Sequence, residues 1–265
     1  MKASLFDRYQ EGKSIIHQLD PRVKLVVTFG YILSNLLLPD GAWIAFGLSL
    51  LFMIVISVVT ELGWFFVVKR SLLALPFALA AVTIMFTLPG APVTSFKLGP
   101  WHLTITDAGL MRFLSILVRS WLSVQAAIVL AATTQFPDLA HGLRHLRIPS
   151  VIVAIILFMY RYLFLLSEEA QRLLRARSAR SASIPGRKGG NLFWRARVAG
   201  NMVGQLFVRS YERSDRIYNA MLARGYKGEF LTIMPHQMAR RDWLIGSMAI
   251  AALLVLQIVG RITLF

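Results

Sequence analysis

Long uncharged stretches separated by short polar segments dominate the hydropathy pattern of this chain. The uncharged windows cover residues 26–39, 41–60, 71–96, 120–137 and 244–260. A helix needs roughly 20 mostly apolar residues to cross a hydrocarbon core of about 30 Å. Each window can hold one such helix, although Pro89-Gly90 divides the third into a span followed by a loop. The pattern therefore predicts an all-α membrane protein with about five transmembrane helices.

A sixth apolar stretch, residues 148–160, lies between Arg147 and Arg161 and is only 13 residues long. Because about 17 residues are needed to span, we interpret it as the apolar start of an amphipathic helix along the membrane face. With the N-terminus inside, four crossings return the chain to the cytoplasm. The expected organisation is therefore 1–134 with helices one to four, 135–241 as a cytoplasmic domain of amphipathic helices, and 242–265 as a final crossing, with Phe265 outside.

The charge distribution supports this orientation. Residues 135–241 hold 18 of the 29 Lys and Arg and 6 of the 13 Asp and Glu, whereas 89–107 contain Lys97 as their only Lys or Arg. Cytoplasmic loops of membrane proteins are enriched in Lys and Arg. A net charge of +16 on a chain that is 56% hydrophobic and 16% charged is therefore explained by topology. Nucleic-acid binding is the less favoured interpretation.

Two helices are predicted within the basic segment. Residues 167–180 place Glu168 and Glu169 first and arginines last, which suits a helix dipole. Residues 183–190 contain the helix-stopping and flexible glycine positions. Residues 191–223 form the second helix, and Arg224-Gly225 follows it with glycine as a left-handed cap.

Catalytic and cofactor motifs are not recognised. Gly12-Lys13-Ser14 lacks the earlier glycine of a phosphate-binding loop, and Asp7 stands there instead. His141 and His145 have two-histidine spacing without a third ligand nearby, so no metal site is predicted. The absence of cysteines excludes thiolate chemistry. We expect a non-enzymatic chain without a cofactor.

Arg112 and Arg119 are seven residues apart in the fourth helix region and share a face. An intramembrane cation is a functional candidate. Contact with a partner subunit and a purely structural role both stay open.

Three short motifs resemble one family. His17, Leu19, Asp20, Pro21, Arg22 and Lys24 resemble the N-terminal signature of the T component, the transmembrane coupling protein of energy-coupling factor (ECF) importers. Ala179-Arg180-Ser181 and Ala223-Arg224-Gly225 resemble its paired motifs at the ends of coupling helices. The segments 158–164, 168–170, 206–214 and 220–226 are most similar to the cobalt/nickel branch, the CbiQ-like proteins.

The resemblance implies an L-shaped protein in a bacterial or archaeal cell (inner) membrane. Each paired motif would dock on one of two ABC ATPase subunits, and a separate substrate-binding membrane (S) subunit would receive the movement, with a small accessory membrane subunit as an optional partner. Cobalt or nickel is the expected substrate, and a vitamin is the alternative. An independent carrier would instead show acids or broken helices at midmembrane.

One apolar face is expected, on its helical spacing, to pack on the S subunit or on the underside of the spanning helices, with plain core packing as the alternative. Its residues are Ile152, Ile156 and Met159.

Overall fold

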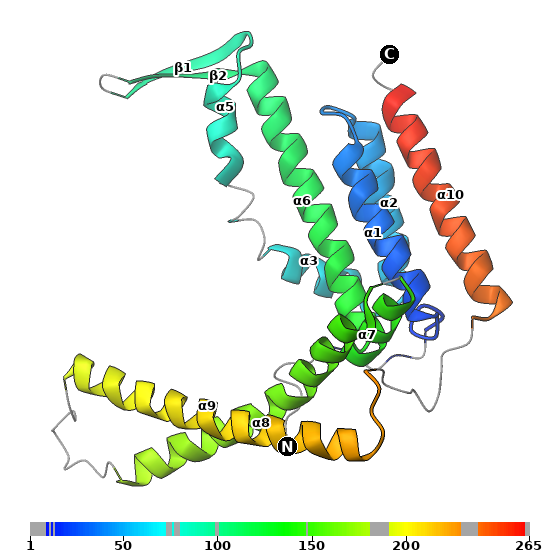
Figure 1. Ribbon diagram of the computed structural model, residues 1–265. Coiled ribbons are helices and arrows are strands. Elements are labelled where there is room, and N and C mark those ends of the chain that lie inside the picture. The colour runs from blue at the N-terminus through cyan, green and yellow to red at the C-terminus, as the bar shows by residue number, and fades with distance from the viewer. Residues whose placement is uncertain are drawn as a thin grey trace. The chain divides into compact units, whose positions relative to one another are not determined.

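The chain forms two compact units, defined in a computed structural model (Figure 1). The structure describes residues 9, 10, 12, 14–72, 76, 80–98, 101–146, 148–180, 191–228 and 238–262. Residues 2–142 and 235–265 form the bundle unit. Residues 143–234 form the crossed-helix unit. The short helix α7 (Phe136–His145) falls at the boundary between them.

Four long helices build the bundle unit: α1 (Pro21–Leu37), α2 (Trp43–Val59), α6 (Asp107–Thr133) and α10 (Arg240–Ile262). α1 and α2 each pack against both α6 and α10. Tyr31, Phe46, Met53, Leu122 and Leu253 belong to the buried core between them. Four of the five windows that the sequence marked as spans therefore appear as the four helices of one bundle, and the predicted all-α membrane fold is confirmed.

The starts of α1 and α6 have explicit caps. The Asp20 carboxylate accepts a hydrogen bond from the Arg22 backbone N–H at 2.9 Å, and Pro21 occupies the first helical position. The Thr106 hydroxyl accepts one from the Gly109 N–H at 3.2 Å. Such caps satisfy N–H groups that have no partner within the helix.

Several polar side chains inside the bundle form hydrogen bonds within and between its helices. The Tyr31 hydroxyl donates to the Ser49 carbonyl at 3.1 Å, and the Ser49 hydroxyl donates to Asn35 Oδ1 at 2.7 Å. The Gln257 amide donates to the Ser34 carbonyl at 2.7 Å, which links α10 to α1. Because hydrocarbon offers no alternative partner, such pairs help helices to associate within a bilayer.

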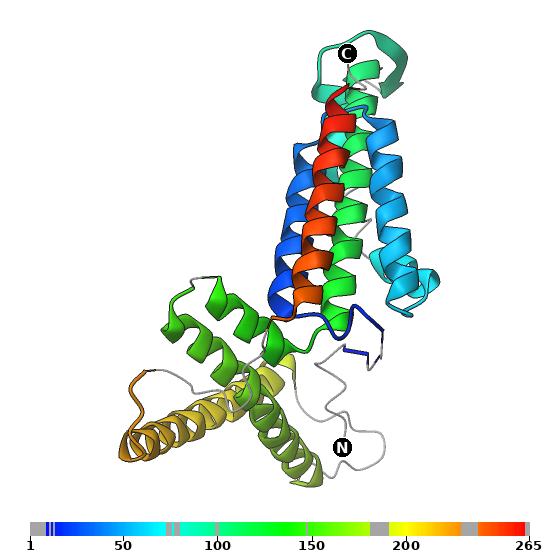
Figure 2. The ribbon, with the colours of Figure 1, turned by 90° about the vertical axis from the view of Figure 1, so that its right-hand side faces the viewer.

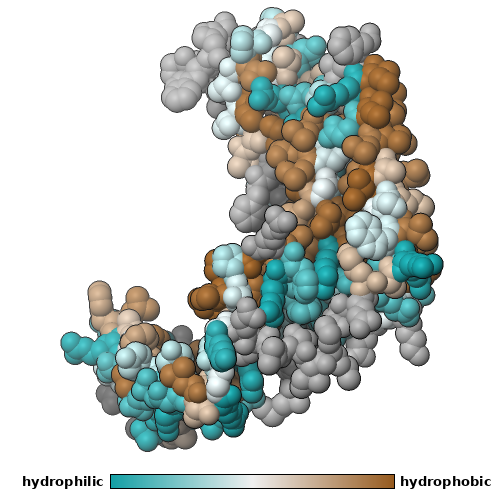
Figure 3. All heavy atoms as spheres, turned by 45° about the vertical axis from the view of Figure 1, so that its right-hand side comes forward, coloured by the Kyte–Doolittle hydropathy of each residue, from teal (hydrophilic) through white to brown (hydrophobic). Residues whose placement is uncertain are grey.

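The outer surface of the bundle unit is apolar. Figure 3 shows hydrophobic side chains along its long helices. Among the described residues, three helices are long and apolar enough to cross a membrane, namely α6, α10 and α8 (Ser150–Arg180), while α2 is a shorter apolar helix. Exposed apolar helices of this length are typical of membrane proteins.

The third predicted window differs from the expectation. Its described parts are α3 (Trp64–Ser71), a 3-10 turn (Ala80–Thr83), α5 (Ile84–Thr87) and the first residues of strand β1 (Pro92–Leu98). β1 pairs antiparallel with β2 (Trp101–Thr106), so the loop expected after Pro89-Gly90 is wrong. Valine, threonine and aromatic residues in both segments favour the strand conformation.

The crossed-helix unit consists chiefly of α8 and α9 (Leu192–Ala223). α8 is one continuous helix of 31 residues, where two separate elements were expected. Its apolar part also exceeds the 13 residues counted in the sequence, because the helix continues past Arg161 with that side chain exposed. The length argument against a span here is therefore wrong, and the cytoplasmic placement of residues 135–241 stays a prediction based on charge.

α9 agrees with its prediction. Asn191 caps its start, Arg224 follows its last residue, and Gly225 has a φ of +80° in the left-handed region. The stop and turn predicted over 183–190 lie outside the described residues.

Candidate functional site

The N-terminal motif ties the start of α1 to the end of α6. The buried Lys24 ammonium donates to the His17 carbonyl at 3.0 Å and to the Thr133 carbonyl at 3.1 Å. Asp20 and Pro21 begin α1, and Leu19 is buried. These contacts give five residues of the motif, together with the Arg22 backbone N–H, a structural role inside this chain.

The surroundings of His17 lower the pKa of its imidazole. The Ser14 hydroxyl lies 2.6 Å from its Nδ1. Burial lowers the pKa of His17 below the usual 6.5, and the nearby Lys24 lowers that pKa further, while Glu61 acts in the opposite direction. A neutral imidazole suits the hydrogen bond with Ser14.

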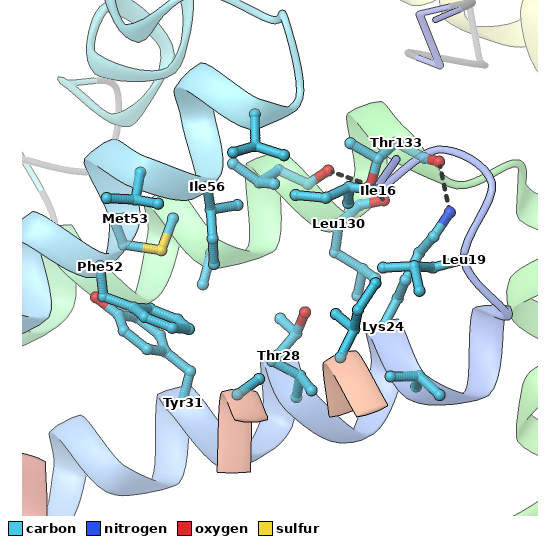
Figure 4. Close-up of a pocket in the computed structure, with 18 of the residues that line it drawn as sticks. Ile16, Leu19, Lys24, Thr28, Tyr31, Phe52, Met53, Ile56, Leu130 and Thr133 are labelled. Atoms are coloured by element: carbon cyan, nitrogen blue, oxygen red, sulfur yellow. Dashed lines mark hydrogen bonds between the residues drawn. The ribbon is translucent and has the colours of Figure 1, made fainter. Parts of the chain in front are cut away.

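An apolar cavity of about 450 Å³ lies among the helices of the bundle unit. Figure 4 shows Tyr31, Phe52, Met53 and Ile56 along it, and Lys24 at one end with its hydrogen bond to Thr133. Among the described residues, those that line it include no Asp or Glu.

The two arginines of α6 share a partner that the sequence did not reveal. Arg119 Nη2 lies 2.7 Å from Asp40 Oδ1 and also donates to the Leu38 carbonyl. Arg112 Nε lies 3.8 Å from Asp40 Oδ2. Asp40 belongs to the turn between α1 and α2. Arg119 therefore fixes that turn, which gives it a structural role, while the half-exposed Arg112 keeps both interpretations.

α8 and α9 cross each other, and their C-terminal ends lie on opposite sides of the crossing (Figures 1 and 2). Arg180 is the last residue of α8, and Arg224 is the C-cap of α9. Both side chains are exposed, as are Ala179, Ala223 and Gly225. Ser181 lies outside the described residues. The two predicted motifs thus place one exposed guanidinium group at the C-terminal end of each of the two crossed helices.

An ion pair joins the helices at the crossing. Glu169 Oε1 lies 2.5 Å from Arg209 Nη1 of α9, and Glu169 Oε2 lies 3.6 Å from Arg172 Nε. Glu168 and Glu169 stand in the middle of α8 rather than at a helix start, so the dipole explanation for their position is wrong. The sequence signal for the pair was an acid within an arginine-rich stretch, which does not identify its partner.

An apolar groove of about 480 Å³ runs beside this crossing. Phe158, Tyr162, Ile217, Tyr218 and Met221 are among its lining residues. The predicted face is different: Ile152 and Met159 are exposed, Ile156 is half-buried, and none of the three is among the residues that line the groove. What this face contacts stays a prediction.

Metal ligands are not grouped in the described part of the chain, where three or more His, Cys, Asp or Glu side chains never gather. His141 and His145 lie on α7.

The sequence model of a family described as "Cobalt transport protein" (CbiQ) matches residues 12–237. The "Energy-coupling factor transporter transmembrane protein EcfT" of Lacticaseibacillus paracasei is 29% identical, with 97% of this chain and 99% of that protein covered. Its namesake from Clostridium kluyveri is 26% identical over 96% of both chains. The "Cobalt transport protein CbiQ" of Rhodobacter capsulatus is 29% identical over 66% of this chain and 69% of that protein.

Proposed function

Because the chain belongs to the CbiQ cobalt transport protein family, we propose that it is the transmembrane coupling subunit, or T component, of an ECF-type ABC importer. It would not hydrolyse ATP itself. Two ABC ATPase subunits would bind it, and ATP-driven movement would pass through α8 and α9 to an S subunit in the same membrane. The family match supports this proposal because it spans both helices and both arginine motifs.

The observation that carries the ATPase proposal is the placement of Arg180 and Arg224. The two side chains are exposed at the ends of crossed helices, on opposite sides of the crossing. An exposed guanidinium offers a planar set of donors to carboxylates or carbonyls in a partner's groove. Two such ends suit two ATPase subunits.

Ile152, Ile156 and Met159 supply the proposed S-subunit contact. Exposed apolar residues at helical spacing are typical of a protein or lipid contact. Substrate would be bound by the S subunit, and we propose cobalt or nickel because the family and the R. capsulatus relative carry cobalt in their names. A vitamin-binding S subunit is the alternative.

Copurification tests the function. Coexpression with candidate ATPase and S subunits from the same genome should yield a complex whose native mass contains two ATPase copies. A chain that purifies without ATPase and still imports substrate would be an independent carrier. A chain without ATPase that binds DNA in a salt-sensitive way would be a nucleic-acid anchor.

Single cysteines test the topology, since the natural chain has none. Cysteines at Ser150 and Ser183 should not react with an impermeant reagent added outside intact cells. Labelling at Ser183 from outside would contradict a cytoplasmic crossed-helix unit.

A further inference from the structure

The contact between α8 and α9 depends on few side chains. α9 has no buried residue among those described, and α8 buries only Val153 and Ala154. Leu166 of α8 and Leu206 of α9 border a small cavity of about 200 Å³ at the crossing, together with Glu169 and Arg209. Apolar packing, which is non-directional, therefore fixes the crossing angle only weakly.

The Glu169–Arg209 ion pair is a directional contact that can fix the crossing angle of the two helices. The Glu169 side chain is 18% exposed, although it lies in an arginine-rich unit where most side chains face outward. It pairs across the helices with Arg209 and along its own helix with Arg172. A short charge-assisted hydrogen bond has a narrow geometric optimum, unlike a contact between leucines.

The position of the pair matters for the two helix ends. At 1.5 Å per residue, Glu169 lies about 16 Å along α8 from Arg180, and Arg209 lies about 22 Å along α9 from Arg224. A change of about 10° in the crossing angle would displace these ends by about 3 and 4 Å. Such a displacement exceeds the range of distances over which a hydrogen bond forms.

We propose that Glu169 and Arg209 are positioning residues whose ion pair acts as a pin, meaning that it holds the angle between α8 and α9 fixed. Movement of one helix end then turns both helices together instead of changing the angle between them. The inference rests on the proposed function, because the moving ends are those that would hold the ATPases. Without the pin, ATP hydrolysis continues while its movement is absorbed at the crossing. The result is hydrolysis that is poorly coupled to import.

The transport test uses the complete complex in proteoliposomes, with radiolabelled Co²⁺ as the probe. Glu169→Gln and Arg209→Gln should keep both ATPases and hydrolyse ATP, while Co²⁺ imported per ATP falls about tenfold. Combining Glu169→Arg with Arg209→Glu should restore most of the ratio. Glu168→Gln, which alters the exposed neighbour, and Arg172→Gln, which removes only the pair within α8, should match wild type. An unchanged ratio in Glu169→Gln would overturn the pin.

A distance measurement decides the same question without transport. Spin labels on cysteines replacing Ser178 and Asn219, near the two helix ends, report the crossing angle by pulsed electron double resonance. Wild type and Glu168→Gln should give one narrow distance distribution, and Glu169→Gln a broad one that the charge swap narrows. A narrow distribution in Glu169→Gln would overturn the proposal. A wild-type chain that holds no ATPase would contradict the proposed function, and this measurement would still test the pin.

Discussion

The two units of this chain differ in how much of their side-chain surface they bury within the chain. In the bundle unit, Lys24 and Asn35 are buried and paired within the chain. In the crossed-helix unit, α9 leaves all its described side chains at least partly exposed, including Phe193 at 82% and Phe207 at 70%. A helix that buries nothing within its own chain gains little from tertiary packing. The difference agrees with the proposal that other subunits contact the crossed-helix unit.

The sharpest test of this contrast removes both outward-facing arginines. Arg180→Ala and Arg224→Ala together should release both ATPases and abolish import, while the melting temperature of the isolated chain changes little. Each single change should weaken binding by about 2–5 kcal/mol, roughly 30-fold to several thousand-fold, because it leaves a partner charge unpaired. Pull-down of tagged ATPase measures the loss. Arg175→Ala and Lys227→Ala, which alter exposed cations nearby, are the controls. A double variant that retains ATPase and import would refute the docking assignment.

A charge on the apolar face of α8 should weaken binding of the S subunit without weakening binding of the ATPases. Ile156→Asp places a carboxylate at the proposed S-subunit contact, at a cost of several kcal/mol, about 2–7, if no partner forms. The S subunit should be lost from the purified complex while both ATPases stay. Leu174→Asp, on the same helix beyond the crossing and already half exposed, should keep the S subunit. Wild-type assembly of the Ile156 variant would show that this face contacts neither the S subunit nor the interior.

A substitution at a buried residue of the bundle unit should lower the stability of the chain and leave partner binding intact. Lys24→Ala removes the donor from the His17 and Thr133 carbonyls, and hydrogen bonds of charged groups contribute about 1.5–3 kcal/mol each. Both bonds together amount to about 3–6 kcal/mol, so the melting temperature in detergent should fall by about 6–24 °C, with ATPase binding retained in the folded fraction. Lys69→Ala, an exposed lysine of α3, should leave it unchanged. Loss of ATPase without loss of stability would contradict the structural role of Lys24.

The smallest expected effect is a pH dependence of the bundle unit. The pKa of His17 is lowered in the folded chain, mainly by burial and then by Lys24, so the unfolded chain binds the extra proton first. This contribution to stability is complete above pH 6.5 and is lost as the pH falls below that value. Thermal melts across this range should show less dependence in His17→Gln than in wild type. An identical dependence in both chains would place the titrating group elsewhere.

The sequence predicted the parts of the fold that depend on hydropathy and caps. α1, α2, α6 and α10 correspond to uncharged windows, and Gly225 ends α9 as expected. The continuity of α8 was missed because Arg161 was treated as a boundary, whereas an exposed arginine interrupts neither the helix nor its hydrogen bonds.

The partners of charged residues could not be predicted in the same way. Asp40 and Arg119 are 79 residues apart, and Glu169 and Arg209 are 40 apart. Hydropathy and helical spacing report which face a residue occupies, but long-range pairing depends on how helices pack and cross. The two helix-end arginines were identified by resemblance, and their partner contacts stay a prediction.

The crossing of α8 and α9 has a consequence for symmetry. Paired ATPases of identical sequence would be related by a two-fold axis, whereas one copy of this chain offers unequal arms of about 16 and 22 Å, which end at Arg180 and Arg224. With the crossing angle fixed as proposed, both arms turn through the same angle, and the end of the longer arm moves farther. The two proposed ATPase contacts would therefore travel unequal distances even where the two ATPases are identical.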